Sequence, residues 1–242
     1  MSRKLIKRRI LERLLGSLAS PTSPKVQLEQ YTMPEDLAAR ILSLAAYTFD
    51  DIIGKFIIDL GCGSGRLAIG AAILGAGYVV GVDLDPEAIK IAKANAEKVC
   101  VKGIVDWVLT DIETLRGRCD TVLQNPPYGT KKRGADVRFL GKAMEMAKVV
   151  YSLHKSATDA YVRRFVEKRG ARITAIFTTK MRIPKTFSFH RKRVYYVDVN
   201  LYRIEREKPL GAEESEEGLR KPTFRVNGLN GSVVIGKEKK ES

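Results

Sequence analysis

Cysteine, histidine and tryptophan are scarce in this 242-residue chain, which has three cysteines, two histidines and a single tryptophan. Cys62, Cys100 and Cys119 show no Cys-x-x-Cys spacing, and only His154 and His190 could join them as metal ligands. A structural zinc site needs four suitably spaced ligands, and a disulfide scaffold needs paired cysteines. We therefore expect no metal site, no disulfide framework, and a reducing, cytoplasmic location.

Long hydrophobic runs are also missing. No stretch reaches the roughly 18 consecutive apolar residues that a membrane span needs. Within residues 1–18 the apolar positions are interrupted by basic ones such as Arg3, Lys7 and Arg13, unlike the apolar core of a secretory signal. We expect neither a membrane span nor a secretory signal.

Acidic residues are few relative to basic ones. The chain has 28 Asp and Glu against 43 Lys and Arg, which gives a formal net charge of +15. A surplus of this kind suits a polyanionic partner, and RNA or DNA is the first candidate. A basic surface that binds no nucleic acid is the alternative that charge alone leaves open.

Length and composition predict one α/β domain, over residues 25–205, with an addition at each end. Residues 1–24 have the spacing of a basic amphipathic helix that ends near Gly16, followed by a linker rich in Ser and Pro. We expect this helix to pack on the core with its basic face in solvent, and a basic arm that binds nucleic acid is the alternative.

The C-terminal addition, residues 206–242, changes character. It carries a glutamate-rich run at residues 213–217 and then two Asn-Gly turn signals. These signals predict a small hairpin between residues 224–226 and 233–235, and a disordered tail is the alternative.

Strand and helix patterns alternate along the main domain. Short apolar runs predict strands, and stretches of helical periodicity between them predict helices. Alternation of this kind is typical of βαβ units, which build a mostly parallel sheet with helices on both faces. The expected strands cover residues 56–60, 78–83, 104–110, 119–123, 149–153, 173–179 and 194–204, and the expected helices cover residues 34–46, 65–74, 86–98, 137–147 and 157–169. The prediction is a seven-stranded α/β fold.

A glycine-rich turn follows the first expected strand. Gly61, Gly63 and Gly65 lack side chains, so the backbone can approach a ligand, and the following helix N-terminus offers free N–H groups. About 20 positions further on, Asp83 ends the second strand, where a carboxylate can accept hydrogen bonds from ribose hydroxyls. The G-x-G-x-G spacing departs from the G-x-G-x-x-G of dinucleotide binders. It favours S-adenosylmethionine over NAD.

Asp111 follows the third expected strand. Its carboxylate could hold the adenine amine while the neighbouring backbone meets a ring nitrogen, and a helix N-cap is an equal alternative. The residues that we expect to contact the cofactor on these grounds are Asp59, Gly61, Cys62, Gly63, Gly65, Asp83, Leu84, Asp111, Ile112 and Asn125.

The turn Asn125-Pro126-Pro127-Tyr128 follows the fourth expected strand, where open α/β sheets place their sites. An exocyclic aromatic amine or an amide is a poor nucleophile, because its lone pair is delocalised. The Asn125 side-chain oxygen and the Pro126 carbonyl could each accept one substrate N–H and aim the nitrogen lone pair at a methyl donor. Tyr128 would stack on the planar group. We interpret Asn125, Pro126, Pro127 and Tyr128 as catalytic, and a turn that merely terminates a strand is the alternative.

The same turn contains no Asp or Glu that could act as a strong base. This fits a reaction in which the proton leaves after methyl transfer, when the product nitrogen is acidic. Alone, the turn leaves adenine, cytosine and glutamine open as acceptors.

Several segments together resemble the methyltransferase-like protein five family, the N6-adenine methyltransferases of small-subunit ribosomal RNA, in an archaeal form. The resemblance extends over residues 28–203. The segments that carry it are Leu28-Glu29-Gln30-Tyr31-Thr32, the loop 59–65, residues 74–77, the turn and its continuation at 125–131, residues 150–156 and residues 189–192.

This resemblance implies a Rossmann-like class I methyltransferase in which Gln30, Tyr31 and Thr32 lie against S-adenosylmethionine, the product being S-adenosylhomocysteine. It implies an adenosine of rRNA as the substrate. It also implies a small zinc-containing adaptor of the Trm112 type, which pairs along the sheet edge in eukaryotic relatives. Tyr128 stands where the family often has phenylalanine, and the tail beyond residue 207 has no counterpart that we recognise.

Basic residues cluster directly after the catalytic turn and around the loop between the last two strands. If they face the mouth of the site, they would follow RNA phosphates and make binding salt-dependent. The residues expected to contact RNA are Lys131, Lys132, Arg133, Lys155, Lys180, Arg182, His190, Arg191 and Lys192.

Methylation of adenine N6 in rRNA is therefore the leading hypothesis. Methylation of glutamine N5 in release factors is an alternative, because an amide nitrogen poses the same chemical problem. A non-catalytic RNA-binding factor of ribosome assembly that retains a cofactor pocket is the alternative from another class.

Overall fold

The computed structural model describes residues 5–21, 25, 32–128, 134–184, 194–206 and 224–226, with the backbone alone for residues 184 and 224–226. Predictions for Gln30, Tyr31, Lys131, Lys132, Arg133, His190, Arg191 and Lys192 therefore lie outside the described residues.

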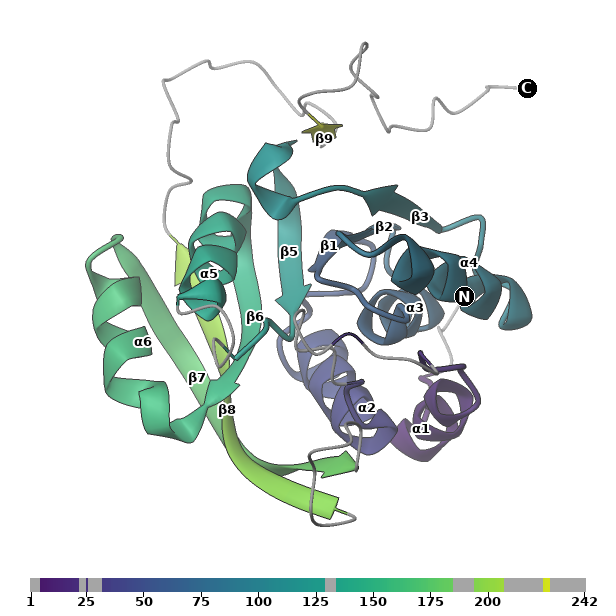
Figure 1. The fold of residues 1–242 in the computed structure, drawn as a ribbon, viewed down its shortest axis with the longest axis horizontal. Helices are drawn as coiled ribbons and strands as arrows, with labels where there is room; N and C mark the ends of the chain where they lie inside the picture. The colour runs from purple at the N-terminus through teal and green to yellow at the C-terminus, as the bar shows by residue number, and fades with distance from the viewer. Residues whose placement is uncertain are drawn as a thin grey trace.

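A seven-stranded sheet forms the centre of the molecule (Figure 1). Its first five strands run parallel, whereas β8 is antiparallel to both of its neighbours. Across the sheet the strands are β3 (Val105–Leu109), β2 (Tyr78–Asp83), β1 (Phe56–Leu60), β5 (Cys119–Gln124), β6 (Ala147–Lys155), β8 (Val194–Arg206) and β7 (Ala171–Pro184). The predicted seven-stranded, mostly parallel sheet is confirmed.

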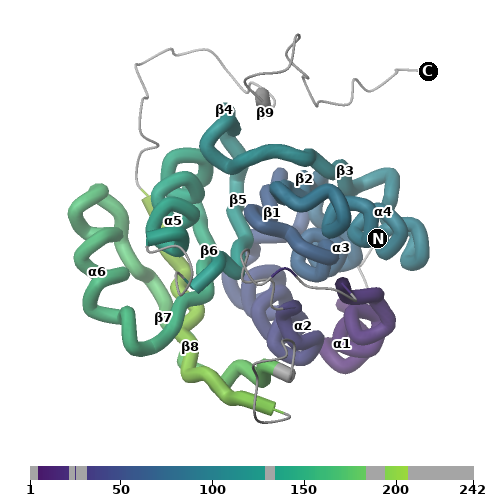
Figure 2. Tube along the Cα trace, viewed as in Figure 1, coloured from purple at the N-terminus to yellow at the C-terminus, as the bar shows by residue number. Residues whose placement is uncertain are grey.

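Helices cover both faces of this sheet, each over its own buried apolar cluster (Figures 1 and 2). One cluster collects side chains of α1, α2 and α3 with Ala96 of α4, and the other collects side chains of α5 and α6. The helices are α1 (Arg8–Gly16), α2 (Glu35–Ser43), α3 (Arg66–Ile73), α4 (Pro86–Lys98), α5 (Ala135–Met146) and α6 (Asp159–Glu167). Short turns of other helix types are η2 (Leu44–Thr48), η3 (Ile112–Thr114) and η4 (Ser156–Thr158).

Local sequence explains where several of these elements begin. All five residues of β1 are buried, as expected for an apolar strand covered on both faces. Asp85 caps α4 by accepting a hydrogen bond from the Glu87 backbone, and Pro86 occupies the first helical position. In α1, Leu11 and Leu15 are four residues apart and fully buried, so this helix packs on the core as expected.

A small second sheet joins β4 (Leu115–Gly117) to β9 (Phe224–Val226) in antiparallel register. The sequence predicted a hairpin between residues 224–226 and 233–235, but the first of these segments pairs with β4. Residues 233–235 lie outside the described part of the chain. Local turn signals cannot reveal a partner strand that lies more than 100 residues away in the sequence.

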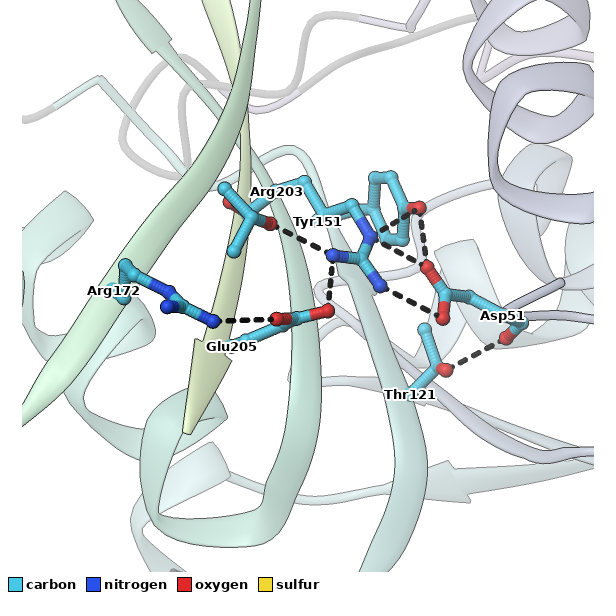
Figure 3. Close-up of polar contacts among 7 residues, drawn as sticks. Asp51, Thr121, Tyr151, Arg172, Arg203 and Glu205 are labelled. Atoms are coloured by element: carbon cyan, nitrogen blue, oxygen red, sulfur yellow. Dashed lines mark hydrogen bonds and ion pairs between the residues drawn. The ribbon is translucent and has the colours of Figure 1, made fainter. Parts of the chain in front are cut away.

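A buried ion pair between Asp51 and Arg203 joins the segment after α2 to strand β8 (Figure 3). Arg203 of β8 donates from Nε to Asp51 Oδ2 at 2.8 Å and from Nη2 to Oδ1 at 3.2 Å. The Tyr151 hydroxyl of β6 donates to the same carboxylate at 2.6 Å, and Thr121 of β5 donates to the Asp51 carbonyl at 2.7 Å. One aspartate therefore connects three strands of the sheet to the segment that follows α2.

Replacing Asp51 with Asn should lower the free energy of unfolding by about 3 kcal/mol, because it removes the buried carboxylate that pairs with Arg203 and leaves the more exposed Glu205 as the remaining counter-charge. Urea unfolding followed by circular dichroism measures this change. Arg172→Ala is the matched control, since Arg172 is 72% exposed and pairs with Glu205 at 3.6 Å. It should cost about 0.5 kcal/mol or less. Equal losses in the two variants would contradict the central role of Asp51.

Candidate active site

A cavity of about 250 Å³ opens where β1, β2 and β5 end at their carboxyl edges. Parallel strands bring the segments that follow them to one edge of a sheet, which is where such folds place their ligands. The residues that line the cavity are Pro21, Thr32, Met33, Asp59, Gly61, Cys62, Gly63, Ser64, Arg66, Leu67, Asp83, Leu84, Ala88, Thr110, Asp111, Ile112, Asn125, Pro126, Pro127, Tyr128, Ala135, Arg138 and Phe139.

The glycine-rich turn adopts left-handed backbone angles, with φ of 69° at Gly61, 54° at Gly63 and 83° at Gly65. A Cβ on Gly63 would meet no atom within 4 Å, so this glycine leaves open space at the cavity wall. At Gly65 a Cβ would lie 2.4 Å from the Trp107 ring. Gly65 was predicted to contact the cofactor, yet it is absent from the cavity lining. Glycine is needed at this position because a Cβ would clash with Trp107 and because φ is positive.

Asp59 is the buried carboxylate beneath this turn, with 1% of its surface exposed. Its Oδ2 accepts a hydrogen bond from the Ala68 backbone at 2.9 Å, whereas Oδ1 is buried without a partner. Burial, with a further contribution from Asp83, raises the pKa of Asp59 to about 7. A buried carboxylate with an unused oxygen suits a cationic donor, and the ammonium group of S-adenosylmethionine is one.

Asp83 ties the end of β2 to the glycine-rich turn. Its Oδ2 accepts from the Gly63 backbone at 2.8 Å, and its Oδ1 accepts from the Asp85 backbone at 2.9 Å. Burial raises the pKa of this carboxyl despite these two hydrogen bonds. Each carboxylate oxygen has a second lone pair, so Asp83 keeps the acceptor capacity that ribose hydroxyls require.

Asp111 caps η3, since its Oδ1 accepts from the Glu113 backbone at 3.0 Å. The same oxygen lies 3.4 Å from Nη2 of Arg138, which comes from α5. The capping alternative is therefore present in the structure. Because Asp111 and Ile112 also line the cavity, their contact with adenine stays a prediction that this geometry permits.

The Asn125-Pro126-Pro127-Tyr128 turn closes the other side of the cavity. The Tyr128 hydroxyl lies 3.3 Å from Asn125 Oδ1 and 3.5 Å from the sulfur of Met181. Lys155 places its ammonium 5.3 Å from the centre of the Tyr128 ring. Thus the predicted catalytic turn and the predicted cofactor turn share one cavity.

The predicted RNA-binding residues of the described chain divide into two groups. Lys155 adjoins the catalytic turn through Tyr128. Lys180 and Arg182 are exposed on β7 and alternate with buried Met181, the residue that reaches Tyr128. Alternate strand residues point to opposite faces, so Lys180 and Arg182 project away from the face that meets the turn.

Several cavity residues gave no signal in the sequence. Pro21 belongs to a segment that looked like a plain linker, yet Asn95 of α4 binds that segment at Ala19 and the glycine-rich turn at Ser64. Arg66 is buried and contacts the Met33 carbonyl. Only long-range packing brings such residues to the cavity, so no local pattern could have indicated them.

The fold and this cavity define a class I methyltransferase, which depends on S-adenosylmethionine. The family model for ribosomal protein L11 methyltransferase (PrmA) matches residues 41–125, which carry the glycine-rich turn. A protein of Methanocaldococcus jannaschii is 41% identical over 84% of this chain and 95% of its own length. The rRNA N(6)-adenosine-methyltransferase METTL5 of Danio rerio is 36% identical over 80% of this chain and 96% of its own. The chain belongs to the METTL5 family.

A solved structure supports the same grouping. The crystal structure of a candidate RNA methyltransferase from Pyrococcus horikoshii matches with a TM-score of 0.77 and 37% identity. The match covers 84% of this chain and 99% of that one.

Among the described helices, none combines the length and apolar character of a membrane span.

The affinity for S-adenosylmethionine should rise as the pH increases from 5.5 to 7, by up to about tenfold per unit. Protonated Asp59 cannot pair with the ligand ammonium, and its raised pKa of about 7 means that the neutral form dominates below that pH. Isothermal titration calorimetry across this range measures the change. Asp59→Asn should bind more weakly and with little pH dependence. An equally flat profile for the wild type would contradict this role of Asp59.

Proposed function

We propose that this chain is an S-adenosylmethionine-dependent methyltransferase that modifies N6 of an adenosine in small-subunit ribosomal RNA. The observation that carries the proposal is the shared cavity of the Asn125–Tyr128 turn and the cofactor turn. Relatives from Danio rerio, Drosophila melanogaster and Caenorhabditis elegans, all named rRNA N(6)-adenosine-methyltransferases, support this choice of substrate.

The cofactor site would be formed by three carboxyl-edge segments. Asp59 would receive the ammonium group, Asp83 the ribose hydroxyls, and the segment at Asp111 the adenine. Of the residues that the family resemblance adds, Thr32 lines the cavity, which supports its predicted contact with the cofactor. S-adenosylmethionine supplies an electrophilic methyl group on its sulfonium when it is bound.

The Asn125–Tyr128 turn would orient the acceptor nitrogen. Asn125 Oδ1 and the Pro126 carbonyl accept the two N–H groups of the adenine amine, and the rigid Pro-Pro backbone holds the carbonyl direction. The nitrogen lone pair then points at the methyl group, so positioning and preorganised acceptors supply the catalysis. Because Asn125 Oδ1 has two lone pairs, it can retain the Tyr128 hydroxyl contact while it accepts from the substrate.

Tyr128 would stack on the flipped adenine. Lys155 lies over its ring, with the ammonium 5.3 Å from the ring centre. The Lys155 ammonium beside this ring would also place positive charge near the phosphate of the flipped nucleotide. The formal net charge of +15 supports binding to RNA.

A small zinc-containing adaptor of the Trm112 type is proposed as a partner, on the family resemblance. The edge strand β3 offers a docking place, since β2 is its single neighbour among the described strands. Such an edge presents unpaired backbone groups that another strand can bind. We place the enzyme in the cytoplasm.

Incubating the protein with S-adenosylmethionine and unmodified rRNA should yield N6-methyladenine, detected by mass spectrometry of nucleosides. Asn125→Ala should lower kcat by at least about 100-fold, because removing one preorganised acceptor typically costs this much. Calorimetry should give a similar S-adenosylmethionine affinity for both proteins. Absence of RNA methylation with the adaptor present would overturn the proposal, and methylation of a release factor in its place would favour glutamine N5 as the acceptor.

Two substitutions of Tyr128 should separate the contribution of its ring to catalysis from that of its hydroxyl. Tyr128→Phe keeps the stacking ring and loses the hydroxyl contact to Asn125, so its kcat/KM should fall by up to about fivefold. Tyr128→Ala removes the ring, and the loss should be about 10- to 100-fold, as stacking on a base is worth about 1–3 kcal/mol. Steady-state kinetics with rRNA measure both. If Phe and Ala have equal effects, stacking is not the function of this ring.

A further inference from the structure

Four polar side chains form a chain between the sheet and α5. Gln124 is the last residue of β5 and lies opposite Ser152 in the register with β6. Gln124 Nε2 donates to Ser152 Oγ at 2.8 Å, and this oxygen is 2.6 Å from His154 Nε2. His154 Nδ1 faces Asp136 Oδ2 at 3.9 Å, in the first turn of α5. We call these four residues the Gln124–Asp136 relay.

Three of the four relay residues are closed to solvent, and Asp136 is 16% exposed. Gln124, Ser152 and His154 are 2%, 0% and 1% exposed, and the Tyr202 ring packs edge-on against His154 with centroids 5.8 Å apart. Their neighbours belong to the apolar cluster under α5 and α6. A buried polar group that lacks its partner costs about 1–3 kcal/mol, so apolar residues would serve packing alone at lower risk. The polar side chains therefore call for another explanation.

One arrangement of protons satisfies the centre of the relay. The Ser152 hydroxyl accepts from Gln124 and donates to His154 Nε2, which leaves the ring proton on Nδ1 directed at the Asp136 carboxylate. The separation of 3.9 Å makes this last contact an electrostatic one. Contact with His154 is the main cause of a lowered pKa at Asp136. The imidazole thus connects a β-strand end to a helix start.

We propose that His154 is a positioning residue that holds both ends of the segment bearing the catalytic turn. Gln124 directly precedes Asn125, and Asp136 lies at the beginning of α5, the helix that follows this segment. Fixing both ends limits where the Asn125 acceptor oxygen can lie, and displacements near 1 Å are enough to lose catalysis.

The proposal rests on the proposed methyl transfer and predicts a selective defect. None of the four relay residues is among those that line the cavity, so the cofactor contacts should survive its loss. Breaking the relay should therefore lower kcat and leave the S-adenosylmethionine affinity unchanged. A residue that merely stabilised the fold would instead weaken thermal stability and cofactor binding together.

A double-mutant cycle tests the relay in the full-length protein. Ser152→Ala removes the hydroxyl between Gln124 and His154, and Asp136→Asn removes the charge that His154 faces. Single-turnover rates are measured with saturating rRNA and S-adenosylmethionine, and cofactor affinity is measured by calorimetry. Each variant should lose about tenfold in rate, and the double variant no more than about twofold beyond either, because both break one chain. Ser152→Thr keeps a hydroxyl and should recover most of the rate.

Thr121→Val is the matched control, because it also removes a buried hydroxyl from the same sheet, one that donates to the Asp51 carbonyl outside the relay. It should lower the melting temperature without a selective loss of rate. Unchanged rates in Ser152→Ala, losses that multiply in the double variant, or a rate loss matched by weaker cofactor binding would each overturn the relay. An inactive wild type would refute the methyl-transfer proposal, which keeps the two failures distinguishable.

Discussion

The parallel pairing of β1 with both β2 and β5 is the constraint on which the site depends. Leu60, the last residue of β1, pairs with Val82 on one side and with Gln124 on the other. The residues that come next are therefore Gly61, Asp83 and Asn125, side by side at one edge of the sheet. The glycine-rich turn, Asp83 and Asn125 are neighbours because backbone hydrogen bonds set the register of three strands.

The buried polar groups of the sheet differ in what satisfies them. On the face under α2, Asp51 is satisfied by Arg203, Tyr151 and its backbone contact, which locks the ends of distant segments together. On the face under α5, Ser152 satisfies His154 Nε2, whereas Nδ1 faces the Asp136 carboxylate at 3.9 Å without a hydrogen bond. Asp59 keeps one oxygen without a partner, and Asp59 lines the cavity. An unpaired buried oxygen in a residue that lines the cavity fits the expectation that a ligand completes its hydrogen bonding.

Much of the fold was predictable from local pattern. The apolar run at residues 56–60 is β1 and the capped, Pro-initiated pattern at 86–98 is α4, in agreement with expectation residue for residue. The expected strand at residues 173–179 is only part of β7, which extends over Ala171–Pro184. Residues 180–183, beyond the expected strand, alternate charged and apolar side chains. Pairing with the long β8 extends the strand beyond its apolar centre.

By itself the sequence determined the strand and helix periodicity, the glycine-rich turn, Asp83 and the Asn125–Tyr128 turn, because each is a short motif whose chemistry depends on adjacent residues. Tertiary structure alone decided that Gly65 makes room for Trp107, that Pro21 lines the cavity, and that His154 stands between Ser152 and Asp136. These relations join residues far apart in the chain or depend on which way a side chain faces. The physical reason is that packing and register are set by the whole sheet, which no local spacing encodes.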